Sequence, residues 1–308
     1  MKGKILRVLA ENSDLIHSGE KLSVKLGVSR VSIWKHIKKL QQLGYQIETS
    51  ASGYQLVSSP DALYPWEFPQ RESSIHYYQE VNSTMTIAKE LARKECPHFT
   101  VVIAEEQLAG RGRLSRIWHS AGGGLYFTIV LRPQIPPNLV SRYGFAASLV
   151  LARTMQKHFG IDAQVKWPND ILVNEKKLCG MLSEMEAVDE QVSFLNIGIG
   201  INVNNDPTHH EPNATSIRAL LGETVPRKKV LNLFLDAFEE EISQVTLDHV
   251  LFEWKKYAIT LGREVTIIST KDTLQGKAVD IDDTGALILE LKDGTVETVY
   301  YGDCFHQP

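Results

Sequence analysis

The sequence lacks any apolar run that could cross a bilayer. A membrane-spanning helix needs about 20 consecutive apolar residues, and no run in the 308 residues approaches that length. The first seven residues, MKGKILR, also do not lead into the apolar core of a secretory signal peptide. We therefore expect a protein with no membrane contact that works in the cytoplasm.

Cysteine is scarce as well. The three cysteines, Cys96, Cys179 and Cys304, are odd in number, widely spaced and in no metal-ligand pattern. The ten histidines are scattered along the chain. These features indicate a reducing compartment and predict no metal site built from a cluster of protein side chains.

Several motifs of common nucleotide-binding and hydrolytic enzymes are missing. The chain has no GxxxxGK[ST] loop, no GxGxxG after a strand, no HExxH, no CxxC pair and no GxSxG. If the chain is an enzyme, it is therefore neither a P-loop ATPase nor a common hydrolase.

Acidic residues are absent from one long region. Between Glu106 and Asp162 there is no Asp or Glu, whereas seven Lys and Arg residues occur. The region opens with the loop QLAGRGRLSR, residues 107–116, between apolar runs that predict strands at 101–104 and 125–131. Glycine lets a backbone approach a ligand closely, and arginine offers a planar fork that matches phosphate or carboxylate. We expect an anion-binding site here; the alternative is a surface loop with solvated arginines.

The net charge of −4 is divided unequally along the chain. Residues 1–60 hold nine Lys and Arg against four Asp and Glu, a balance of +5, and the remainder holds 24 against 33, a balance of −9. A basic segment on an acidic body indicates that the first domain contacts nucleic acid.

The first 60 residues carry the signals of three helices and a hairpin. Helices are expected over residues 4–10, 20–26 and 29–43, and hairpin strands over residues 45–49 and 54–57. Ser18 and Ser29 can cap the second and third helices, and Gly27 lies in the turn between them. This order predicts a winged helix-turn-helix.

The outward side of the third helix is polar and basic. It comprises Ser29, Arg30, Ser32, Lys35, Lys38 and Lys39. These residue types contact phosphates and base edges in a major groove. Trp34 is ambiguous, since it can pack beneath the wing or touch DNA. We favour DNA binding over a small domain with a solvated basic face, because spacing, caps, wing and charge agree.

A proline-rich segment follows the wing. Three prolines fall within residues 60–69, which is typical of a linker. We accordingly divide the chain into a DNA-binding domain, a linker, a central domain and a C-terminal domain: residues 1–60, 61–74, 75–260 and 261–308.

Three stretches of the central domain could form a ligand site. Asn82-Ser83-Thr84 can cap a helix over residues 85–94 and leave a polar pocket, or serve as an ordinary cap. Asn169-Asp170 follows a strand that breaks at Pro168, and Asp170 can be structural or can anchor Mg²⁺. Lys177 opens an apolar strand, where it can snorkel or act as a positioned charge.

The run NIGIGINV, residues 196–203, has the sharpest alternation in the chain. Its bulky face carries isoleucine and valine, and its bare face carries Gly198, Gly200 and Asn202. Either a ligand or a second layer of packing can lie against the glycines. After it, short strands over residues 265–269, 274–281, 286–291 and 296–301 predict a small C-terminal barrel.

Four motifs in this order carry a resemblance to a known family. They are EQxAGRGRxxRxW (106–118), KWPND (166–170), KLxG (177–180) and GIGIN (198–202). With them, the chain resembles, essentially end to end, the BirA family of bifunctional biotin protein ligases and biotin operon repressors. Lipoate ligases are similar in the central fold but do not usually combine the GRGR loop with KWPND.

The resemblance implies a fold class and a function. The fold is multi-domain α+β, with an N-terminal winged helix-turn-helix, a central mixed α/β biotin/lipoate-ligase-like catalytic domain and a C-terminal SH3-like β-barrel. The enzyme uses ATP, Mg²⁺ and biotin to make biotinyl-5′-AMP, then transfers biotin to a lysine of a biotin carboxyl carrier protein of the acetyl-CoA carboxylase type. The adenylate is also the corepressor of a homodimer that binds biotin operator DNA, and we expect the dimer contact near the Gly198–Val203 strand.

The resemblance also implies site residues. Biotin would be bound by Ser83, Thr84, Gln107, Gly110, Arg111, Gly112, Arg113, Lys177, Gly198 and Gly200. The nucleotide would be bound by Arg113, Arg116, Trp118, Lys166, Asn169, Asp170, Lys177 and Asn202. Lys177 and Arg113 would be catalytic, and no protein metal ligand is expected. Met85 departs from the polar residue found after Ser-Thr in many relatives, so it is excluded from the hydrogen-bonding set.

Two other readings remain at this point. In one, the ligase is kept and the winged helix is only a brace with weak, unspecific DNA affinity; the basic third helix argues against it. In the other, the central domain senses a small molecule without catalysis; the presence of both Arg113 and Lys177 argues against that.

Overall fold

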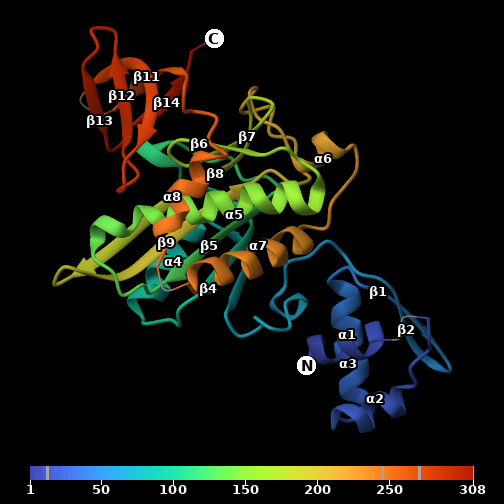
Figure 1. Ribbon diagram of the computed structural model, residues 1–308. Coiled ribbons are helices and arrows are strands. Elements are labelled where there is room, and N and C mark those ends of the chain that lie inside the picture. Colours follow the sequence, from blue (N-terminus) through green and yellow to red (C-terminus); the bar gives the residue numbers. More distant parts are fainter. Residues whose placement is uncertain (12–13, 245, 270–271, 308) are drawn as a thin grey trace. The chain divides into compact units, whose positions relative to one another are not determined.

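The computed structural model describes residues 1–11, 14–244, 246–269 and 272–307. The chain divides into two compact units, Met1–Ser73 and Ser74–Pro308 (Figure 1). None of the helices that the structure describes is both long and apolar enough to span a membrane.

The first unit is the predicted winged helix. Its elements are α1 (Lys2–Glu11), α2 (Gly19–Leu26), α3 (Arg30–Gln42), β1 (Gln46–Ser50) and β2 (Gly53–Ser58). Ser18 and Ser29 cap α2 and α3, each accepting a hydrogen bond from the backbone N–H three residues later. Gly27 ends α2 in the left-handed conformation, with φ of 65°. Each predicted element is therefore present, and the caps act as expected.

The proline-rich segment packs on this unit. It forms a short 3-10 helix, η1 (Pro65–Glu67), and the Trp66 indole N–H donates to the Tyr45 hydroxyl at 2.9 Å. Tyr64 stacks on Trp66, and both rings lie against the core of the three helices. Aromatic residues between the prolines thus give the segment apolar surface to bury, which a flexible linker would lack.

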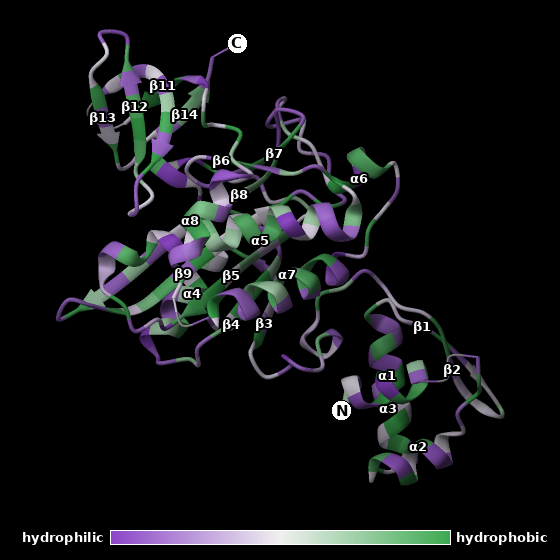
Figure 2. Ribbon diagram, viewed as in Figure 1, coloured by the Kyte–Doolittle hydropathy of each residue, from purple (hydrophilic) through white to green (hydrophobic). Residues whose placement is uncertain are grey.

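A mixed sheet forms the centre of the second unit. Its strand order is β3-β4-β5-β9-β8-β7-β6, and only the β3–β4 pair is parallel among the described pairings. The strands are β3 (Ile75–Val81), β4 (Thr100–Gln107), β5 (Leu125–Leu131), β6 (Gln164–Lys166), β7 (Asp170–Val173), β8 (Lys176–Val188) and β9 (Gln191–Ile201). Figure 2 shows that β5 and β9 are largely hydrophobic, and all seven residues of β5 are buried.

Helices cover both faces of this sheet. They are α4 (Thr84–Arg93), α5 (Ser141–Phe159), α6 (Ile217–Leu221), α7 (Arg227–Ile242) and α8 (Asp248–Lys255), with short 3-10 turns η2 (Arg113–Ser115) and η3 (Pro137–Leu139). Phe127 of β5 meets Phe234 of α7 edge-on, and α5 packs on α7 and α8 (Figure 1). Thr128 and Val130, on the opposite face of β5, lie against α4. Alternation along β5 therefore separates an α5/α7/α8 face from an α4 face.

The third sheet is C-terminal and antiparallel, in the order β13-β12-β11-β10-β14. Its strands are β10 (Glu264–Ile268), β11 (Thr273–Ile281), β12 (Leu287–Leu291), β13 (Val296–Val299) and β14 (Asp303–His306). The expected small β-domain is confirmed. The fourth expected strand ends at Val299 instead of Tyr301, and β14 follows after Gly302.

One expectation fails on topology. The strand containing Gly198–Ile201 is β9, which is paired along its whole length with β5 on one side and with β8 on the other. Its backbone donors and acceptors are used inside the sheet, so a second copy cannot pair with it. The free edges of this sheet belong to β3 and β6.

Trp167 joins the central sheet to the C-terminal domain. Its ring is 1% exposed, its indole N–H donates to the Gly285 carbonyl at 3.0 Å, and its backbone N–H donates to the Thr260 hydroxyl at 3.0 Å.

We predict that Trp167→Ala lowers the free energy of unfolding of this unit by about 3–5 kcal/mol, because a buried ring and its hydrogen bond are lost together. Urea unfolding followed by circular dichroism measures the change. Phe252→Ala, which removes a ring that is 66% exposed, is the matched control and should change stability little. Equal losses in the two variants would contradict the role of Trp167.

Candidate functional site

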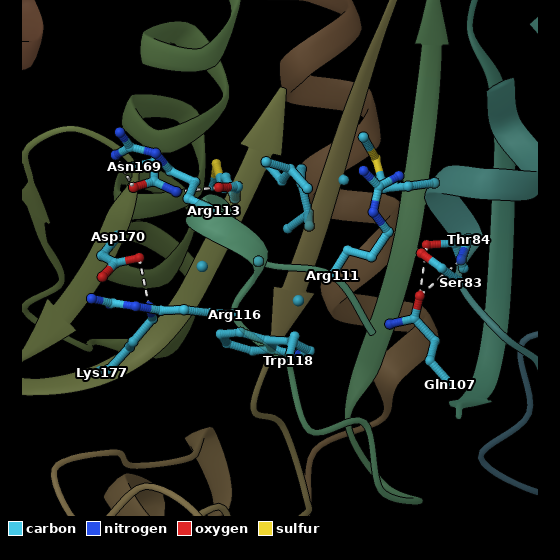
Figure 3. A pocket seen from close by; sticks show the side chains of 18 of the residues that line it. Ser83, Thr84, Gln107, Arg111, Arg113, Arg116, Trp118, Asn169, Asp170 and Lys177 are labelled. Atoms are coloured by element: carbon cyan, nitrogen blue, oxygen red, sulfur yellow. Dashed lines mark hydrogen bonds and ion pairs between the residues drawn. The ribbon is translucent and has the colours of Figure 1, made fainter. Parts of the chain in front are cut away.

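A pocket opens on the α4 face of the central sheet. Residues that the sequence singled out line it: Ser83, Thr84, Gln107, Arg111, Gly112, Arg113, Arg116, Trp118, Asn169, Asp170, Lys177, Gly198 and Gly200. Figure 3 shows Ser83, Thr84 and Gln107 at one end and Asn169, Asp170 and Lys177 at the other, with Trp118 between them. The four motifs, separated by up to 120 residues, thus meet in one cavity.

A chain of hydrogen bonds fixes the polar end. The Gln107 side-chain oxygen accepts from the Thr84 backbone N–H at 2.8 Å and from the Thr84 hydroxyl at 3.1 Å. Thr128 donates to the Thr84 hydroxyl at 2.8 Å, and the Gln107 amide donates to Ser120 at 2.8 Å. The helix start of α4 is therefore satisfied by a glutamine from β4.

Ser83 behaves differently from its expected role as a cap. It occupies the N-cap position of α4, but its side chain caps nothing. Its hydroxyl is buried and has no hydrogen-bond partner among the described residues. A buried hydroxyl without a partner is costly unless a ligand or water completes it, so Ser83 is available to a polar group of a ligand.

The glycines of β9 let side chains lie flat on the sheet. A Cβ atom at Gly200 would lie 2.4 Å from the Trp118 indole, and one at Gly198 would lie 2.6 Å from the Met85 sulfur. At Gly180 of β8 it would lie 2.8 Å from the Trp118 ring. The bare face expected from the sequence is thus covered by Trp118 and Met85, which form an apolar floor between the two polar ends.

Cations gather at the other end, and three of them have an acidic partner. Lys177 pairs with Asp170 at 2.8 Å, Arg111 pairs with Glu184, and Arg116 pairs with Asp303. The acid-free stretch of sequence is therefore not acid-free in space, because these carboxylates come from β7, β8 and β14. Among the described pocket cations, Arg113 is held by a neutral group, the Asn169 side-chain oxygen, at 3.2 Å.

Arg113 is also the buried member of the set. Burial lowers the pKa of its guanidinium from the usual value, an effect that Asp303 and Asp170 oppose. Arginine stays protonated in proteins, so the shift measures how unfavourable the buried charge is without an anion. A carboxylate or phosphate entering the pocket would relieve that cost.

Comparison with known proteins follows the same division of the chain. The HTH domain model matches residues 2–55, the Biotin/lipoate A/B protein ligase family model matches residues 77–204, and the Biotin protein ligase C terminal domain model matches residues 260–307. The bifunctional ligase/repressor BirA of Bacillus subtilis (strain 168) is 34% identical over 98% of each chain. This chain belongs to the BirA family.

The family sets the fold and the two activities. BirA of Escherichia coli (strain K12) is 30% identical over 96% of this chain and 93% of its own. A solved biotin protein ligase from Aquifex aeolicus, in complex with biotin and ATP, is 27% identical and superposes with a TM-score of 0.65 over 76% of this chain and 99% of its own. The expected family and fold class are confirmed: the chain is a biotin protein ligase joined to a helix-turn-helix repressor domain.

A second cavity of this BirA-family chain adjoins the first. Arg116, Trp118 and Lys177 line both, and Asn202 lines the second alone. The rings of His119 and His210 stack 4.0 Å apart on its wall, joining the loop after β4 to the loop after β9. The predicted residues are therefore split between two connected chambers.

Two of the predicted residues lie outside both linings. Gly110 has no room for a side chain, because a Cβ would lie 2.2 Å from the Trp118 carbonyl, and its own carbonyl accepts from the Trp118 N–H at 2.8 Å. Its glycine is thus explained by the fold of the loop. Lys166 extends toward the C-terminal domain, with its ammonium 6.0 Å from the centre of the Phe305 ring.

Glu184 and Asp303 are pocket residues that the sequence did not reveal. Each binds an arginine of the loop, but neither stands in a motif and Asp303 is 187 positions from Arg116. A search for carboxylates able to balance three arginines would have been the one available signal.

The DNA-binding face is on α3. Arg30, Lys35, Lys38 and Lys39 are exposed, and Ser32 is partly exposed. Ser29 is the cap of the helix: its hydroxyl accepts from the Ser32 backbone N–H at 3.2 Å. The predicted basic surface is present, with Ser29 serving to start the helix.

We predict that Gly200→Ala displaces the Trp118 indole, because no space exists for the added methyl group. Fluorine NMR of protein labelled with fluorotryptophan, in which Trp118→Phe identifies one of the five tryptophan signals, should show that signal shifted. Gly198→Ala is the matched control, since its methyl group meets the flexible Met85. An unshifted Trp118 signal in Gly200→Ala would show that the floor is not tightly packed.

Proposed function

We propose that this chain joins the biotin carboxylate to the α-phosphate of ATP and then transfers biotin to a lysine of a biotin carboxyl carrier protein. In the first step a carboxylate oxygen attacks the α-phosphorus, the bond to the β-phosphate breaks, and pyrophosphate leaves with biotinyl-5′-AMP remaining. In the second step the lysine amine attacks the acyl carbon, loses a proton, and AMP leaves. The observation that carries this proposal is the single cavity joining an uncharged polar end to a cationic end.

Biotin fits the first chamber in one direction. Its ureido group needs both donors and acceptors, which Ser83, Thr84 and Gln107 offer. Its apolar body suits the floor of Met85 and Trp118, and its carboxylate would then reach the cations. Gly112, Gly198 and Gly200 take part by leaving space, and we propose that Gly110 contributes only through the loop.

The cations would act on the reacting groups. Bringing a carboxylate onto a phosphate opposes two anions, so positive charge aimed at the developing phosphorane lowers the barrier. We propose that Lys177 contacts the carboxylate and the α-phosphate, and that Arg113 binds the same phosphate from the other side. Arg111 and Arg116 would exchange their protein carboxylates for the ligand and close the loop against water.

The nucleotide would continue into the second chamber. Trp118 offers a ring on which adenine can stack, and Asn202 offers hydrogen bonds. Asn169 would act by holding Arg113. Lys166 remains a proposed outer contact for the phosphates, acting from beside the C-terminal domain.

Mg²⁺ fits this site as the companion of ATP. Among the described residues no group of three or more His, Cys, Asp or Glu side chains could hold a metal ion. Mg²⁺ commonly binds through one or two carboxylates together with substrate phosphates and waters, and Asp170 supplies one carboxylate on the pocket wall. The ion would neutralise phosphate charge, and Asp170 would orient it.

The repressor half rests on the first unit. We propose that the biotinyl-5′-AMP-loaded protein forms a homodimer, that two winged helices then bind an operator of biotin genes, and that both activities are exercised in the cytoplasm. Two-fold symmetry would place two α3 helices in successive major grooves. We also propose domain limits of 1–60, 75–260 and 261–308, with residues 61–74 as a packed connection on the first unit.

We predict that Lys177→Met lowers the rate of biotinyl-5′-AMP formation by about 100-fold or more, because a charge aimed at the transition state is lost while the stem of the side chain is kept. Biotin-dependent exchange of labelled pyrophosphate into ATP measures this step alone.

Lys176→Met is the matched control, since Lys176 is the exposed neighbour that lines neither chamber. Wild-type exchange in Lys177→Met would remove Lys177 from the mechanism. Replacing biotin with lipoate tests the nearest alternative enzyme, and exchange with lipoate alone would overturn the proposed substrate.

We predict that the double variant Lys35→Ala/Lys38→Ala makes DNA binding less dependent on salt. Each lost phosphate contact reduces the slope of log K against log salt by about 0.9. Fluorescence anisotropy with a random-sequence duplex at several salt concentrations gives the slope. Lys4→Ala, an exposed lysine on α1, is the control, and an unchanged slope in the double variant would show that α3 does not face DNA.

A further inference from the structure

The exposed face of α3 has an apolar centre within its basic surface. Val31, Trp34, Lys35 and Lys38 follow one another at spacings of three, one and three residues, which places them on one side of the helix. Val31 is 61% exposed and Trp34 is 49% exposed. Ile33, Ile37 and Leu40, on the opposite side, are fully buried. The core of the unit therefore does not need Val31 or Trp34.

Both side chains face one concavity. It is lined by the start of α2, by Arg30, Val31 and Trp34 of α3, and by the wing turn at residues 50–54. Among the described residues Trp34 has no ring-stacking or cation-π contact. A large aromatic side chain left half exposed in a concave surface is typical of a site that another molecule covers.

The surrounding charges favour DNA as that molecule. Arg30, Lys35 and Lys38 border the apolar pair and are exposed. The start of α2 presents backbone N–H groups beside Ser18, which is the kind of helix end that meets phosphates. A second copy of this chain would bring the same positive charges face to face, whereas a duplex brings the opposite sign.

Apolar side chains can read one feature of the major groove. Base edges there offer polar donors and acceptors, except for the 5-methyl group of thymine. We propose that Val31 and Trp34 contact thymine methyl groups in the operator, and that this contact supplies part of the sequence specificity of the repressor. The inference rests on the proposed repressor function and goes beyond it, because it identifies which residues recognise which base.

The test uses uracil in place of thymine. Full-length protein with biotin, Mg²⁺ and ATP first selects a preferred sequence from a pool of random duplexes. In that duplex each thymine is then replaced, one at a time, by deoxyuridine, which keeps base pairing and removes only the methyl group. Because a buried methyl group contributes about 0.8 kcal/mol, the wild-type protein should bind about three to five times more weakly at one or more thymines in each half-site.

Two variants connect that loss to the proposed residues. Trp34→Ala should bind the thymine and uracil duplexes equally at the sensitive positions, and Val31→Ala should lose sensitivity at a subset of them. Val24→Ala removes another exposed apolar side chain, 80% exposed on α2 and outside the concavity, and should keep the wild-type preference. Circular dichroism melting confirms that each variant is folded.

The possible failures are distinguishable. If a sequence is selected but every uracil duplex binds as well as its parent, or if Trp34→Ala keeps the thymine preference, the inference is wrong and the repressor function stands. If Trp34→Ala changes the mass of the dimer without changing the thymine preference, a second copy covers this face instead. If no sequence is enriched, the repressor proposal fails, and the inference fails with it.

Discussion

The close approach of Trp118 to the glycines of β9 determines the shape of the whole pocket. With 2.4 Å between the indole and a hypothetical Cβ at Gly200, the ring can lie flat only because that strand has no side chains on the α4 face. The loop carrying Arg111 and Arg113 is tied to the same ring, since the Gly110 carbonyl accepts from the Trp118 N–H. A bare strand thus places an aromatic ring, and the ring's backbone places the arginines.

Much of this arrangement follows from the sequence for a physical reason. The alternation of residues 196–203 requires one bare face on a strand, and the GRGR loop requires a flexible cationic segment next to a strand. Both are local patterns, and both are where they were expected. The helices of the first unit are equally local, because Ser18, Ser29 and Gly27 begin and end them through short-range hydrogen bonds and a left-handed turn.

What could not be predicted depends on contacts distant in sequence. The sequence analysis described no helix after Ile217, although α7 and α8 help to cover one face of the sheet. It took residues 61–74 for a linker, because proline content says nothing about which surface the aromatic residues between the prolines will find. It also missed β9 as an interior strand, since strand order arises from pairing partners and not from the strand's own pattern.

The paired carboxylates change how the cationic end of the pocket should be understood. Four cations so close together would repel one another, and burying them without counter-charges would be costly. Asp170, Glu184 and Asp303 remove that cost in the free protein, so an anionic ligand must exchange partners with them and gains less than the count of cations suggests. Arg113 is the exception, because its partner is the neutral Asn169 amide and burial makes its charge unfavourable. The net attraction for an anion is therefore concentrated at Arg113, between the two chambers, where the carboxylate and the phosphate would have to meet.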